Sequence, residues 1–162
     1  MPYFTAVLAR NGSRWVARDL EVETTEPLVD VAHRLRAVAY DDEPVLLIVE
    51  HEDEWFALVR VDGEDDPRVF LSDVPGVASS SYAELLGADD VVPEPVVRVP
   101  DEDDDGVPEI ANQPAGDADV LADLGVPGEQ LTSLCEEGLP PAEALAEVSA
   151  KAGFEELLDS LR

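Results

Sequence analysis

The chain has 162 residues, of which 38 are Asp or Glu and only 10 are Lys or Arg, so its formal net charge is −28. A nucleic-acid-binding protein needs a basic surface that displaces counterions from phosphates, so this charge argues against direct nucleic-acid binding and against binding to anionic membranes. It favours a basic protein or cations as partners.

The same sequence limits the compartment and the kinds of site. The longest apolar run, residues 45–49, is far shorter than the roughly 20 residues that cross a bilayer. The N-terminus has no basic region leading into an apolar stretch, so it does not resemble a signal peptide. Cys135 is the only cysteine, which excludes intramolecular disulfides and cysteine-cluster zinc sites. We therefore expect a cytoplasmic protein.

Residues 1–88 show the patterns of an α+β domain. Residues 3–10 alternate as a half-buried strand, and Asn11-Gly12 predicts a hairpin turn into a second strand over 14–20. Thr25 is expected to cap a helix with Pro27 in its first turn, and apolar residues at helical spacing continue to about Asp41.

The rest of this region predicts three strands and a closing helix. Residues 45–49 are apolar on both faces, as in a central strand, and strands over 55–61 and 68–71 follow. Residues 79–86 predict a short helix that ends at Gly87. The expected order is ββαβββα, a two-layer antiparallel sheet with at least one helix covering one sheet face.

Composition separates two further parts. Residues 89–118 contain five prolines and the run Asp101-Glu102-Asp103-Asp104-Asp105, which predicts an acidic, disordered linker. Residues 119–162 predict four short helices, near 118–124, 127–137, 140–152 and 154–161. Glycines lie where C-caps are expected: Gly125, Gly138 and Gly153. A core of about 45 residues is marginal by itself, so this helical module is expected to dock on the first domain or on a partner.

Candidate catalytic and metal-binding residues are few, and we expect no catalytic, cofactor or metal site. His33 lies off the apolar stripe of its helix and is expected to face solvent, while His51 is expected to be an exposed turn residue. None of the 38 acids is singled out as an acid–base pair. The Asp101–Asp105 run lacks the alternating ligands of a calcium loop.

Other conspicuous residues also favour structural roles. The isolated glycines form neither a G-x-G-x-x-G nor a Walker pattern, so nucleotide binding has no support. Ser80 or Ser81 is expected to cap a helix, since the nucleophile pattern G-x-S-x-G is absent. The aromatic residues of the predicted strands are expected in the core: Trp15, Trp55 and Phe56.

Several of these segments resemble a known family. The segments are Tyr3-Phe4-Thr5-Ala6-Val7-Leu8-Ala9-Arg10, residues 41–47, residues 52–61 and Leu121-Ala122-Asp123-Leu124-Gly125. Together with residues 68–73, residues 82–86 and the acidic linker, they are similar to the tRNA adenosine deaminase-associated proteins of high-G+C Gram-positive bacteria. The resemblance covers most of the chain.

The resemblance implies a partner or pathway rather than an activity. The deaminase itself makes wobble inosine with zinc bound by His and Cys and with a Glu that moves protons, and this chain lacks the H-x-E and P-C-x-x-C elements. The family supplies no catalytic residues to transfer. We therefore expect a non-catalytic acidic accessory protein that binds the deaminase or another basic protein, with competition for the tRNA groove as one variant.

Two alternatives stay open from the sequence. The first is a small-molecule-binding domain or an unrecognised enzyme with a pocket between sheet and helix, around Arg34, Arg36, Trp55 or Arg60. The second is a structural domain whose charge serves only solubility and whose partners are unrelated to the deaminase.

Overall fold

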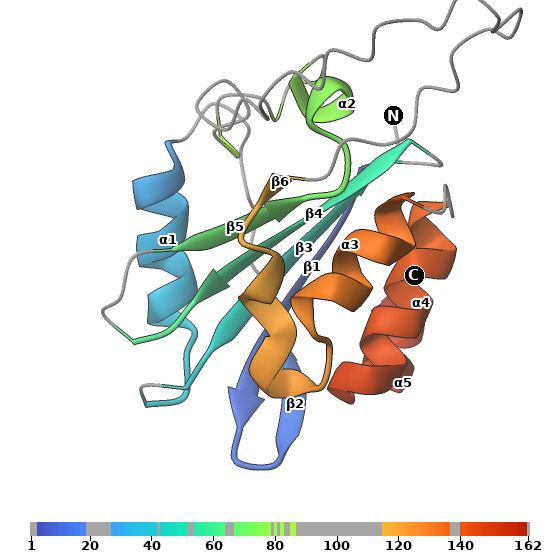
Figure 1. Ribbon diagram of the computed structural model, residues 1–162. Helices are drawn as coiled ribbons and strands as arrows, with labels where there is room; N and C mark the ends of the chain where they lie inside the picture. Colours follow the sequence, from blue (N-terminus) through green and yellow to red (C-terminus); the bar gives the residue numbers. More distant parts are fainter. Residues whose placement is uncertain are drawn as a thin grey trace, which may run out of the picture.

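A six-stranded antiparallel sheet forms the centre of the computed structural model, in the order β2-β1-β3-β4-β5-β6 (Figure 1). The structure describes residues 3–18, 27–41, 43–51, 54–63, 67–78, 80, 82, 85–86, 115–136 and 140–161. The strands are β1 (Tyr3–Asn11), β2 (Arg14–Arg18), β3 (Val45–His51), β4 (Trp55–Val61), β5 (Arg68–Leu71) and β6 (Ala115–Gly116).

The opening hairpin forms as predicted. Asn11 pairs with Arg14 across the two-residue turn, and β1 also pairs along its length with β3. Val7 and Ala9 lie in the core on one sheet face, while Ala6 and Leu8 lie in the core on the other. The middle of β1 is therefore buried on both faces, and the prediction of a half-buried strand is wrong there.

One face of the sheet is covered by α1 (Leu28–Ala37) and by α2 (Val74–Ala78) with the residues after it (Figure 1). Val31, Ala32 and Leu35 form the buried stripe of α1. This helix is shorter than expected. It begins after its N-cap, Pro27, and it ends at Ala37 rather than at about Asp41. Thr25, the expected cap, lies outside the described residues.

The closing helix lies earlier in the chain than predicted. It comprises Val74–Ala78, whereas the described residues within 79–86 form bends and turns, among them one backbone hydrogen bond from Leu86 to Tyr82. The apolar residues of that predicted helix still enter the core: Tyr82, Leu85 and Leu86. Apolar spacing therefore identified buried positions, but not where the helical turns begin.

The opposite face is covered by the C-terminal helices: η1 (Ala118–Leu124), α3 (Gly128–Glu136), α4 (Pro141–Ala152) and α5 (Glu155–Leu161). Their bounds agree with the prediction to within one residue, except that η1 is a 3₁₀ helix. Gly125 and Gly153 end their helices with φ of 101° and 92°, as expected for glycine C-caps. Gly138 lies outside the described residues.

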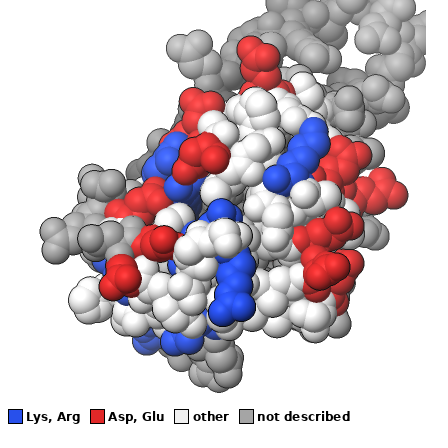
Figure 2. Space-filling model, turned by 90° about the horizontal axis from the view of Figure 1, so that it is seen from below, with Lys and Arg blue, Asp and Glu red and all other residues white. Residues whose placement is uncertain are grey.

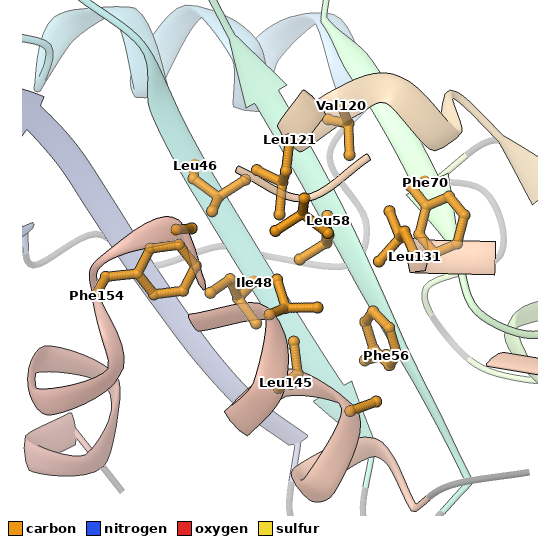
Figure 3. Packing of buried hydrophobic residues seen from close by; sticks show 14 of the residues in the cluster. Leu46, Ile48, Phe56, Leu58, Phe70, Val120, Leu121, Leu131, Leu145 and Phe154 are labelled. Atoms are coloured by element: carbon orange, nitrogen blue, oxygen red, sulfur yellow. The ribbon is translucent and has the colours of Figure 1, made fainter. Parts of the chain in front are cut away.

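The C-terminal helices share one apolar core with the sheet (Figure 3). Leu46, Ile48 and Leu58 project from the central strands toward Leu145 of α4 and Leu121 of η1. The sequence left open whether the helical module docks on the first domain or on a partner. In the structure it packs on the sheet of the first domain. The fold is α+β, and these helices add a third layer to the two predicted.

The division of the chain at residues 88 and 118 stays a prediction. Residues 89–114, including the run Asp101–Asp105, lie outside the described residues. Where the description resumes, Ala115–Gly116 pairs with the end of β5. A side chain at Gly116 would place its Cβ 2.2 Å from the Val69 carbonyl oxygen, so only glycine allows this close approach.

Candidate functional site

Two arginines of the sheet lie side by side beneath η1. Arg60 of β4 pairs with Arg68 of β5, and both side chains project from the face that the C-terminal helices cover. Arg60 is only 5% exposed. A buried guanidinium requires anionic partners, because burial otherwise disfavours its charge.

Three aspartates supply those partners. Arg60 donates to both carboxylate oxygens of Asp123, at 2.5 and 2.8 Å, and to Asp62 at 3.0 Å. Arg68 donates to Asp117. We call these five residues the arginine clasp. Because Asp117 is the N-cap of η1 and Asp123 lies within η1, while the others belong to the sheet region, the clasp ties the C-terminal part of the chain to the sheet.

Backbone groups complete the clasp. Arg60 also donates to the Val120 carbonyl at 2.8 Å, and Arg68 donates to the Asp119 carbonyl at 2.9 Å. The side chain of Asp117 accepts from the Asp119 amide and thereby caps η1. Both guanidinium groups are thus occupied within the chain, which makes the clasp a structural element rather than an anion-binding site.

The clasp shifts the pKa values of Asp123, Asp117 and Arg60 in the directions expected for ion pairs. The hydrogen bond from Arg60 lowers the pKa of Asp123, and the hydrogen bond from Arg68 lowers the pKa of Asp117, although burial opposes both shifts. The hydrogen bond to Asp123 raises the pKa of Arg60 in turn. The clasp therefore favours the ionised forms of all these groups.

The lowered pKa of Asp123 predicts how stability depends on pH. Its contribution is fully present above the unfolded-state pKa, about 3.9, and is lost as pH falls through the lower folded-state pKa. We expect Asp123→Asn to cost about 1 kcal/mol at pH 7, a modest value because this carboxylate is 60% exposed. In urea unfolding, the difference from the unmodified protein should shrink as the pH falls below the unfolded-state pKa and disappear once the pH lies below the folded-state pKa; a difference that stays constant would contradict the ion pair.

A second feature is an exposed acidic surface on the last two helices. Figure 2 shows acidic side chains gathered on the side where α4 and α5 lie. We call this surface the acidic helical face, and its exposed members are Glu143, Glu147, Glu155, Glu156 and Asp159. Residues four apart share one side of a helix, so Glu143 lies near Glu147 and Glu155 near Asp159. This arrangement concentrates negative charge on one surface.

The two histidines have different surroundings. His33 is exposed on α1, as predicted. His51 was expected to be exposed in a turn, and this is wrong: it is the last residue of β3, its side chain is 14% exposed, and its Nδ1 lies 3.1 Å from Glu54. The β3 ladder extends two residues beyond the predicted strand end, because His51 still pairs with Trp55.

The aromatic residues lie in the core as predicted. Trp55 and Phe56 are 0% and 2% exposed, and Trp15 is 8% exposed. The Trp15 indole donates to the Ala152 carbonyl at 3.2 Å, and its ring meets Phe154 edge to face at 5.5 Å. Trp15 therefore joins the edge of the sheet to the end of α4.

The remaining candidates also have local roles. Ser80 accepts from the Tyr82 amide and donates to the Val77 carbonyl, which stabilises the turn after α2. Ser81 lies outside the described residues. Cys135, the only cysteine of the sequence, is buried. Among the residues that the structure describes, no group of three or more His, Cys, Asp or Glu could hold a metal ion.

The residues suggested for a ligand pocket do not converge. Arg34 is exposed on α1, and Arg36 donates to the Gly63 carbonyl. Trp55 lies in the core beneath α1 and α2, whereas Arg60 projects from the opposite sheet face. The sequence suggested Arg60 only as a possible pocket residue, and it did not identify the partner Asp123, 63 positions away.

Comparison with protein families assigns the chain. The model of the Rv3753c-like tRNA adenosine deaminase-associated protein matches residues 3–155. The chain belongs to this family. The expected resemblance is thus confirmed, and the match spans the sheet and the helices η1, α3 and α4. No curated protein and no solved structure gave a match. In the part of the chain that the structure describes, no helix is both long and apolar enough to cross a membrane.

Proposed function

We propose that this protein is a non-catalytic, acidic accessory protein that binds a tRNA adenosine deaminase. The observation that carries this proposal is the family match over residues 3–155, since the family is described by its association with that enzyme. The net charge of −28 supports protein binding rather than direct contact with tRNA phosphates. We propose a cytoplasmic location as well, since the family is described by its association with an enzyme that acts on tRNA.

We assign the acidic helical face as the binding surface. Its five carboxylates are exposed and lie on two adjacent helices; Glu143, Glu147 and Glu155 fall within the family match, whereas Glu156 and Asp159 follow its last residue. Complementary charge speeds encounter between proteins and selects partners. A basic patch on the deaminase is therefore the expected counterpart, and neutralising the acidic helical face should weaken binding.

The test is calorimetric titration of the deaminase into this protein, at low and near-physiological salt. We expect saturable micromolar or tighter binding that survives about 0.15 M salt, where charges more than about 8 Å apart are largely screened. The triple variant Glu147→Gln, Glu155→Gln, Glu156→Gln should weaken it about tenfold or more.

A matched control removes three exposed acids elsewhere: Asp30→Asn, Asp41→Asn and Glu54→Gln. This variant has the same net charge as the first, so equal weakening by both would show that only overall charge matters. Absence of binding at either salt concentration would reject the accessory function.

A further inference from the structure

The sheet has one long open edge, formed by β2. This strand pairs only with β1, and in the described part of the chain no backbone hydrogen bond joins β2 to any other segment. The opposite edge is the two-residue strand β6. Because antiparallel ladders alternate, alternate residues of β2 direct their N–H and C=O groups away from β1. Such an edge can accept an additional strand.

Two exposed arginines mark this edge. Arg14 and Arg18 are the first and last residues of β2, and Val16 lies between them on the same strand face. That face is on the α1 side, because Arg18 donates to the Tyr40 hydroxyl at 3.1 Å and lies 5.4 Å from the centre of its ring. Neither arginine forms an ion pair with a described acid. The two stand about 13 Å apart along the strand.

This pair of charges is unusual for the molecule. The chain as a whole has a net charge of −28. The β1–β2 turn faces the viewer in Figure 2. That end of the molecule shows basic side chains beside uncharged surface, with acidic side chains toward its flanks. Arg10 also lies at this end, over the ring of Trp15 at 5.3 Å. Three arginines, Arg10, Arg14 and Arg18, thus lie together at this end of a strongly acidic chain.

The arginines disfavour a second copy of this chain as the added strand. If β2 paired antiparallel with β2 of another copy about Val16, Arg14 of each would lie opposite Arg18 of the other, and a parallel alignment would place each arginine beside itself. Like charges directly opposite each other destabilise a strand pair. The same positions would stabilise a strand that carries acids there.

We propose that the open edge of β2 binds an extended acidic segment of a partner protein as an additional strand. Its side chains beside Arg14 and Arg18 are acidic, and the one beside Val16, two residues from each, is apolar. Backbone hydrogen bonds supply affinity and the two ion pairs supply specificity. The β2 edge and its acidic partner differ from the acidic helical face and its basic partner. The two proposals can therefore fail independently.

The test uses the full chain and a labelled synthetic peptide, Thr-Glu-Thr-Val-Thr-Glu-Thr, with binding followed by fluorescence anisotropy at about 0.15 M salt. We expect saturable binding, weakened about tenfold by Arg14→Glu with Arg18→Glu. A peptide with Lys in place of Glu should bind this double variant better than it binds the unmodified protein. Lys151→Glu, at an exposed residue of α4, is the control for the single variant Arg14→Glu, since both change the net charge equally.

Two N-methylated peptides distinguish strand addition from a purely electrostatic attraction. One is methylated at the amides that face β2, and the other at the amides that face away from it. Methylation of the edge that pairs with β2 should abolish binding, and methylation of the other edge should leave it unchanged. Equal binding by both methylated peptides, no effect of the double variant, or no binding of the unmodified peptide would each overturn the proposal. So would binding of a poly(U) oligonucleotide through these arginines without binding of the peptide.

Discussion

Replacing Phe154 by Ala is expected to cost about 3–5 kcal/mol of unfolding free energy. The Phe154 side chain is 1% exposed and packs edge to face on Trp15, 139 positions away along the chain. Its loss leaves a cavity between the end of α4 and the edge of the sheet, which neighbouring residues can fill only in part. Urea unfolding monitored by tryptophan fluorescence measures this cost.

Leu161→Ala is the matched control for this prediction. Leu161 ends α5 and is 39% exposed, so its truncation should change the unfolding free energy by no more than about 0.5 kcal/mol. A cost below about 1 kcal/mol for Phe154→Ala would show that the C-terminal helices do not contribute to a common core with the sheet. The same measurement therefore tests whether the third layer is an integral part of the fold.

Arg60→Met is expected to cost about 2–3 kcal/mol. Methionine fills much of the space but leaves the Val120 carbonyl and the Asp123 carboxylate without their donor. The cost stays below that of breaking a fully buried pair, because Asp123 is 60% exposed and retains access to water. Arg14→Met, at an exposed position of β2, should change stability by no more than about 0.5 kcal/mol.

A double-mutant cycle separates the ion pair from the other contacts of Arg60. Asp123→Asn should cost much less in the Arg60→Met background than in the unmodified protein, with a coupling of about 1 kcal/mol. Additive costs would mean that Arg60 stabilises the fold through Val120 and Asp62 alone. High salt should reduce the coupling only in part, since the guanidinium is shielded from solvent.

Local patterns predicted most of the elements. Alternation in β1, the Asn11-Gly12 turn and the apolar stripe of α1 each depend on residues close together in the chain, so spacing alone identifies them. The closing helix was displaced because Val77, Tyr82, Leu85 and Leu86 are buried whether or not the backbone there is helical. Burial determines which residues are apolar, whereas helical hydrogen bonds determine where a helix lies.

The candidate site was harder to predict. Arg60 was suggested only as a possible pocket residue, and any of 38 acids could have been its partner. The choice of Asp123 depends on η1 crossing the end of β4, which no local pattern specifies. The two open-edge arginines were equally inconspicuous, because their role depends on β2 being the outermost strand.

The sequence by itself determined the strong negative charge, the α+β class, the position of most helices and strands and membership of the family. These properties follow from composition, short-range periodicity and matching residues. Only the tertiary structure decided that the C-terminal helices cover the second face of the sheet, that Arg60 pairs with Asp123 and that β2 forms an open edge. Those features join residues far apart in the chain, and apolar burial on both sheet faces brings them together.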